Sequence, residues 1–176
     1  LVNIQANTLD NKEAIDALKI AKNRILAIAH LESKMTIEKE TIKIDEFIKE
    51  LSQSIITALS DDEKLKFTVI YDLADVYIKK VNTTMIGLIL NELITNTTKY
   101  AFDDYKPENK LSISCKIHKT TLKLIISDNG KGYFQNKDVP AKSLGIELVT
   151  EMVKQLNATI VINSAKGTEN IIEIPI

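Results

Sequence analysis

The chain has 176 residues, 44% of them hydrophobic, and a net charge of −1, so we expect one or two domains with a buried core. The balanced charge, with Arg24 as the only arginine, argues against a nucleic-acid partner. A single cysteine, Cys115, excludes an intrachain disulfide framework and favours a small buried hydrophobe. No apolar run approaches the roughly 18–20 residues that cross a bilayer, so we expect no membrane contact from this chain. The chain lacks an initial Met, and we expect it to be a fragment.

Residues 1–40 have the pattern of a helical hairpin segment. Asp10 with Glu13 three positions later is typical of a helix start. Apolar residues then recur every three or four positions from Ile15 to Met35, which predicts one long helix. Since a hairpin alone cannot bury this stripe, we expect a homodimer built as a four-helix bundle, or else packing against the second domain.

Residues 41–176 alternate between strand-like and helix-like patterns. The predicted strands are Thr41–Ile44, Lys66–Tyr71, Val76–Ile78, a hairpin of Leu111–His118 and Thr121–Ser127, and a final pair of Thr159–Asn163 and Asn170–Ile174, ended by Pro175. The predicted helices begin at Asp45, Asn82 and Ser143. Together they predict an α+β domain, a two-layer sandwich in which helices cover a mixed sheet.

The segment Asn91–Phe102, NELITNTTKYAF, places four polar residues on one side of a predicted helix. Glu92, Asn96, Lys99 and Tyr100 follow the spacing i, i+4, i+7 and i+8. A carboxylate, an amide, an ammonium and a phenol in one row could serve Mg²⁺ and a polyphosphate together. An amphipathic helix with a solvated face is equally compatible with this segment alone. The opposite, apolar stripe comprises Ile86, Leu90, Leu93, Thr97 and Ala101.

Glycines mark three further candidate segments. Asp128 ends a predicted strand before Asn129-Gly130-Lys131-Gly132, where its carboxylate could accept a hydrogen bond from the amine of adenine but not from the carbonyl of guanine. Gly145, in the first turn of the predicted helix Ser143–Leu156, leaves N–H groups open to an anion. The alternatives are an ordinary turn and a serine N-cap, and Gly167-Thr168 is a weaker signal between two strands.

In this order the segments NELITNTTKYAF, DNGKG, SLGIELV and GT resemble the ATP-binding domain of the GHKL group, and especially the sensor histidine kinases. The resemblance covers roughly Thr41 to Ile176. The preceding residues look like the second half of the dimerisation hairpin of those kinases. The resemblance therefore implies a partial dimerisation hairpin at 1–40 and an ATP-binding catalytic domain at 41–176.

The resemblance also implies residue roles. Asn96 would hold Mg²⁺, Glu92 would position water or act as a base near the metal, and Lys99 and Tyr100 would contact the phosphates. Asp128 would read adenine. The residues that would support the base and phosphates are Gly130 and Gly132 in the turn, Ser143, Leu144 and Gly145 at the helix start, and Thr168, whose hydroxyl would support Asp128. The segment between Lys131 and Lys142 would form a short lid.

By this resemblance the chain would pass the γ-phosphoryl group of ATP to a histidine, for relay to an aspartate of a response regulator in the cytoplasm. We expect the acceptor histidine upstream, because neither His30 nor His118 has the neighbours of an acceptor motif. The alternatives are a GHKL switch ATPase, an anti-sigma-like serine kinase, and a nucleotide-binding dimerisation unit without transfer. The apolar stripe from Ile15 to Met35 favours the kinase.

Overall fold

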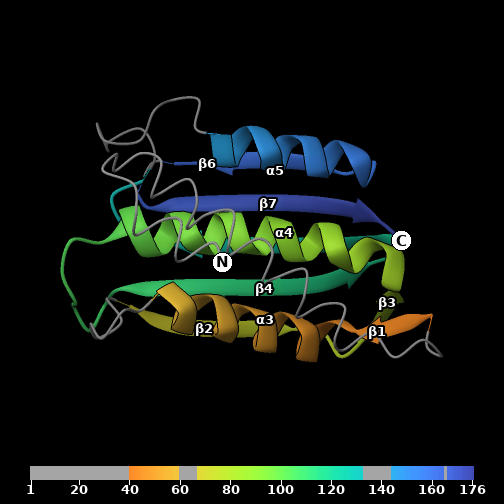
Figure 1. The fold of residues 1–176 in the computed structure, drawn as a ribbon, viewed down its shortest axis with the longest axis horizontal. Coiled ribbons are helices and arrows are strands. Elements are labelled where there is room, and N and C mark those ends of the chain that lie inside the picture. Colours follow the sequence, from red (N-terminus) through yellow and green to blue (C-terminus); the bar gives the residue numbers. More distant parts are fainter. Residues whose placement is uncertain (1–39, 60–66, 133–143, 165) are drawn as a thin grey trace, which may run out of the picture.

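The computed structural model describes residues 40–59, 67–132, 144–164 and 166–176. The predicted hairpin at 1–40 lies outside these residues apart from Glu40, as do most of the predicted lid and Ser143. In the part that is described, helices form one layer and a five-stranded sheet forms the other (Figure 1). The predicted α+β two-layer fold is therefore confirmed for this part of the chain.

The main sheet is mixed. Its strands are β2 (Thr68–Leu73), β4 (Lys110–His118), β5 (Thr121–Asp128), β7 (Thr168–Pro175) and β6 (Thr159–Asn163), in that spatial order. β2 runs parallel to β4, and the other neighbouring pairs are antiparallel. A two-stranded antiparallel sheet pairs β1 (Thr41–Lys43) with β3 (Tyr77–Lys79).

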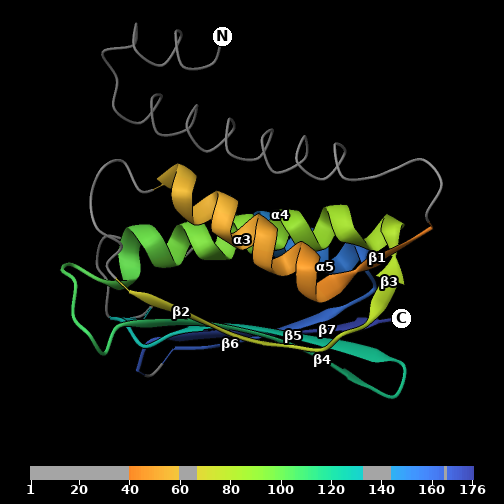
Figure 2. The same cartoon turned by 90° about the horizontal axis from the view of Figure 1, so that it is seen from below.

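Three described helices cover the same face of the main sheet, as Figure 2 shows. They are α3 (Ile44–Leu59), α4 (Lys80–Asn96) and α5 (Leu144–Gln155). α4 lies between the other two and continues into a π-helical turn, η1 (Thr97–Ala101). This arrangement leaves the opposite face of the sheet without a helix from the described ranges.

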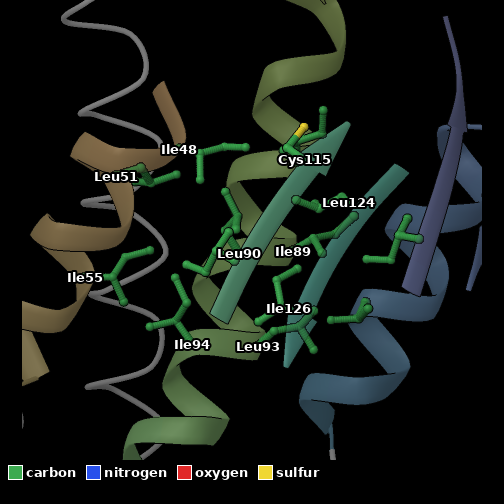
Figure 3. Packing of buried hydrophobic residues seen from close by; sticks show 14 of the residues in the cluster. Ile48, Leu51, Ile55, Ile89, Leu90, Leu93, Ile94, Cys115, Leu124 and Ile126 are labelled. Atoms are coloured by element: carbon green, nitrogen blue, oxygen red, sulfur yellow. The ribbon is translucent and has the colours of Figure 1, made fainter. Parts of the chain in front are cut away.

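Alternate residues of the central strands supply the core (Figure 3). On β5 the buried positions are Leu122, Leu124 and Ile126, and on β4 the same periodicity buries Cys115 completely. Desolvation raises the pKa of the Cys115 thiol to about 12, so this thiol is protonated and inert at neutral pH. The predicted role of Cys115 as a buried hydrophobe is confirmed.

Several predicted boundaries were wrong by one or two residues. Ile44 begins α3 and does not belong to the first strand, although its N–H still donates to the carbonyl of Val76 next to β3. β2 extends to Leu73, since β4 offers a pairing partner as far as Cys115. β7 begins at Thr168 and not at Asn170, because Thr168 pairs with Asp128.

Candidate functional site

The predicted polar row of α4 runs from the interior to the surface. Glu92 is only 5% exposed, Asn96 is half-buried, and Lys99 and Tyr100 are exposed. The alternative of a solvated helix face is therefore wrong at Glu92. Lys99 and Tyr100 lie in the π-helical turn, so their positions depart from the regular α-helical spacing predicted from the sequence.

The first turn of α5 packs against this polar row. A Cβ atom added at Gly145 would lie 3.0 Å from Oε2 of Glu92 and 3.9–4.0 Å from the side-chain amide atoms of Asn96. The glycine thus allows the helix start, with its open N–H groups, to approach a carboxylate and an amide closely. Leu144 opens the helix, and these predicted residues are brought together at one end of the molecule.

Asp128 ends β5 inside a set of hydrogen-bond donors. Its Oδ1 accepts from the N–H of Gly130 at 2.9 Å and from the N–H of Thr168 at 3.3 Å, and its Oδ2 accepts from the hydroxyl of Thr97 at 3.3 Å. Burial raises the pKa of the Asp128 carboxyl, while these hydrogen bonds and one from the Thr168 side chain act in the opposite direction. The contact that the resemblance implied between Thr168 and Asp128 is present.

Glycines bring three backbone segments into contact around Asp128. A Cβ atom at Gly130 would overlap the carbonyl of Ala101, at the end of η1, which already accepts from the N–H of Lys131 at 3.0 Å. A Cβ atom at Gly167 would overlap the carbonyl of Asp128, and its φ of +79° is a conformation that favours glycine. The predicted turn glycine Gly132 also has a positive φ, +73°.

Two residues near the site, Thr97 and Asn129, make contacts that their sequence patterns did not indicate. Thr97 was assigned to the apolar stripe, although it donates to Asp128. Asn129 was treated as a turn residue, but its Oδ1 accepts from the N–H of Lys110 and its Nδ2 donates to the carbonyl of Glu108, both at 2.7 Å. A polar residue within an apolar stripe was the available signal for Thr97; the partners of Asn129 are too distant in sequence to be read from it.

A cavity of about 290 Å³ lies on another side of the same turn. It is lined by residues of the segment 101–109 and by Asn129, Gly130 and Lys131, whose ammonium pairs with the carboxylate of Asp103. Its lining includes Gly130 but none of the side chains predicted to bind the base, the phosphates or the metal. The candidate site is therefore the region between α4, α5 and Asp128, and not this cavity.

The donor set at the candidate site fits Mg²⁺. Oxygen atoms of Glu92 and Asn96 both lie within 4.0 Å of the Cβ position at Gly145, and Mg²⁺ prefers such hard oxygen ligands, supplemented by phosphate and water. The described residues hold no group of three or more His, Cys, Asp or Glu side chains that could bind a metal unaided. A metal here would therefore depend on oxygen atoms of the nucleotide.

Comparisons with known proteins agree with the resemblance drawn from the motifs. A family model described as histidine kinase matches residues 1–59. The whole chain aligns with the sensor histidine kinase PdtaS of Mycobacterium tuberculosis at 24% identity, over 36% of that protein. The chain thus spans about a third of the length of the curated relatives that it matches.

Solved structures share the fold. The histidine kinase domain of a blue-light activated kinase from Erythrobacter litoralis matches with a TM-score of 0.75 and 22% identity, covering 89% of this chain and 74% of that one. The histidine kinase AdeS of Acinetobacter baumannii matches with a TM-score of 0.63 and 20% identity, covering 92% and 79%. The catalytic domain of the histidine kinase ThkA gives 0.61 and 16%, covering 77% and 93%.

Proposed function

We propose that this chain, whose sequence and fold support a histidine kinase catalytic core, binds ATP with Mg²⁺ and transfers the γ-phosphoryl group to a histidine. The observation that carries the proposal is the close approach of α5, at Gly145, to Glu92 and Asn96. In Figure 1 the end of α4, the start of α5 and the start of β7 lie at the same end of the domain. A nucleotide bound there would have its base at Asp128 and its phosphates at the start of α5.

The base would be read by Asp128. Its carboxylate accepts from Thr97, Gly130 and Thr168 and so has a fixed orientation, with acceptor capacity remaining for an amine. Adenine offers an exocyclic amine, whereas guanine would place a carbonyl against the carboxylate. We therefore infer a preference for adenine nucleotides.

The phosphates and the metal would be held by two kinds of group. The N–H groups at the start of α5, at Leu144 and Gly145, would bind phosphate oxygens with help from the helix dipole. Asn96 would ligate Mg²⁺, with Glu92 beside it to orient water or act as a base. Lys99 and Tyr100, both exposed on η1, would reach the outer phosphates. Phosphoryl transfer needs mainly such positioning and charge neutralisation.

The acceptor and the partners follow from the kinase assignment. The match of residues 1–59 to a histidine kinase family favours a kinase over a GHKL switch ATPase, an anti-sigma-like serine kinase or a dimerisation unit without transfer. A homodimer through residues 1–40, joined to an ATP-binding domain at 41–176, would present the acceptor histidine to the nucleotide. The phosphoryl group would then pass to an aspartate of a response regulator. No described helix is long and apolar enough to span a bilayer.

Nucleotide selectivity tests the proposal. The wild-type chain is expected to bind ATP more tightly than GTP by about 1–3 kcal/mol, because guanine would leave the buried Asp128 carboxylate facing an acceptor. Asp128→Asn should narrow this difference, since its amide can donate to guanine. Both nucleotides would be titrated calorimetrically in the presence of Mg²⁺.

The control for this titration is Asp72→Asn, which changes an exposed carboxylate on β2 to the same amide. It should leave the selectivity at the wild-type value. Equal affinity of the wild-type chain for ATP and GTP would contradict the assignment of Asp128. If the wild-type chain bound neither ATP nor GTP, the proposed function itself would be contradicted.

A further inference from the structure

Asn170 is a buried polar residue in an apolar part of β7. Its side chain is only 5% exposed, and its partner in the β5–β7 register is Ile126, whereas Asp128 pairs with Thr168. Side chains two residues apart on a strand share a face, so Asn170 follows Thr168 on the face that the helices cover. Asn170 therefore lies one row further into the core than the residues assigned to the base.

The hydrogen bonds of Asn170 are incomplete. Its Nδ2 donates to the carbonyl of Ile126 at 3.3 Å, which fixes the orientation of the amide, since a flipped amide would place two oxygens together. Its Oδ1 is fully buried and has no hydrogen-bond partner among the described residues. A buried acceptor without a partner is costly, so its presence in β7 calls for a physical explanation.

We propose that Asn170 is a second base-reading residue, whose Oδ1 accepts a hydrogen bond through one water molecule from the exocyclic amine of the bound adenine. This rests on the proposed function. The amine carries two hydrogens, of which Asp128 would accept one and the water the other. Adjacent rows of side chains on one strand face lie about 7 Å apart. One water with two hydrogen bonds spans about 5–6 Å between its partners, and the side chains cover the remaining distance.

A purely structural role predicts a different behaviour. If Asn170 served only to join β7 to β5 through its Nδ2, replacing it would change the stability of the chain but not its choice of base. If it reads the base, the choice of base must change. The distinguishing ligand is N6-methyl-ADP, which retains one of the two amine hydrogens of ADP.

The test compares ADP with N6-methyl-ADP on the full chain by calorimetry. The wild-type protein should bind N6-methyl-ADP about tenfold more weakly than ADP, the factor that corresponds to one hydrogen bond of about 1.4 kcal/mol. Asn170→Leu keeps the approximate size of the side chain and removes the acceptor. In this variant the ratio of the dissociation constants of N6-methyl-ADP and ADP should fall below about threefold. The urea midpoint of this variant without nucleotide shows whether the variant remains folded.

Two further variants complete the experiment. Asn170→Ala should lower the ratio in the same direction, and it provides a smaller side chain if the leucine cannot be accommodated. Ile172→Val changes the next buried residue on the same face of β7 and should leave the ratio at the wild-type value. Normal ADP binding with an unchanged ratio in the folded Asn170 variants would overturn this inference alone, whereas failure of the wild-type chain to bind ADP would overturn the proposed function.

Discussion

At the scale of single residues, Asp128 shows which parts of a candidate site can be predicted from a local pattern. Its position at the end of a strand, before a glycine-containing turn, suggested a base-reading carboxylate only in combination with the other motifs and the resemblance that they carry. Its donors were only partly predictable, because Thr97 and Thr168 are 31 and 40 residues away in the chain. Such contacts depend on how helices and strands pack, and a local pattern does not contain that information.

The raised pKa of Asp128 gives a prediction about stability and pH. Burial raises this pKa above its ordinary value of 3.8, so between 3.8 and the raised value the folded protein holds a proton that the unfolded chain has released. The contribution of Asp128 to the free energy of unfolding therefore falls as the pH rises through this window and stays low above it. Asp128→Asn should unfold at a higher urea concentration than the wild-type protein at pH 7, with the difference shrinking as the pH approaches 4.

Urea unfolding curves of both proteins between pH 4 and pH 7 would measure this difference. Asp72→Asn, at an exposed position, should follow the wild-type curve throughout. A constant difference between Asp128→Asn and the wild-type protein across this pH range would show that the effect does not come from titration of the carboxyl.

At the scale of elements, periodicity predicted which strands and helices form but not how they end. The burial of Cys115 on β4 was predicted correctly, because the alternation of a strand with a period of two is a local property. The π-helical turn after Asn96 was not predicted, since its residues also satisfy an α-helical pattern. The order β2-β4-β5-β7-β6 was not predicted either, because it depends on pairing between distant segments.

The end of α5 provides a prediction at this scale. Asn157 has a φ of +51° and donates its N–H to the carbonyl of Lys154, and the N–H of Ala158 donates to the carbonyl of Val153, which together form a Schellman cap. Asparagine tolerates this left-handed conformation better than other residues with a Cβ atom, because its short polar side chain can hydrogen-bond locally. Asn157→Ala should lower the free energy of unfolding by about 1 kcal/mol. Alanine has a Cβ atom but no polar side chain that could hydrogen-bond locally, so it disfavours a positive φ more than asparagine does. Asn157→Gly should raise it slightly.

Chemical denaturation would measure both variants, with Gln155→Ala as the control, since this exposed residue lies within the helix, where alanine is well tolerated. A loss at Asn157→Ala no greater than that at Gln155→Ala would mean that the left-handed conformation contributes nothing measurable to the stability of the cap.

At the scale of the whole molecule, the two-layer arrangement explains why separate motifs form one site. Helices on one face of the sheet place the end of α4 beside the start of α5, and the antiparallel pairing of β5 with β7 places Asp128 beside Thr168. The order of motifs along the chain indicated which segments belong together. It did not indicate Asn170, because a single polar residue inside a strand pattern resembles an ordinary interruption of that pattern.

The last prediction concerns the chain as a unit: it should bind nucleotide without phosphorylating itself on histidine. The chain has two histidines, of which His118 is exposed at the end of β4 and His30 lies outside the described residues. His30 falls within the predicted apolar stripe, where a charged phosphohistidine would disturb packing.

A protein extended at its N-terminus to include the acceptor helix expected upstream should phosphorylate itself, because the nucleotide site is expected to be complete here. Acid-labile incorporation of labelled phosphate would be measured for the chain, for His30→Ala and for the extended protein. Labelling of the chain that disappears in His30→Ala would identify His30 as the acceptor and contradict the prediction.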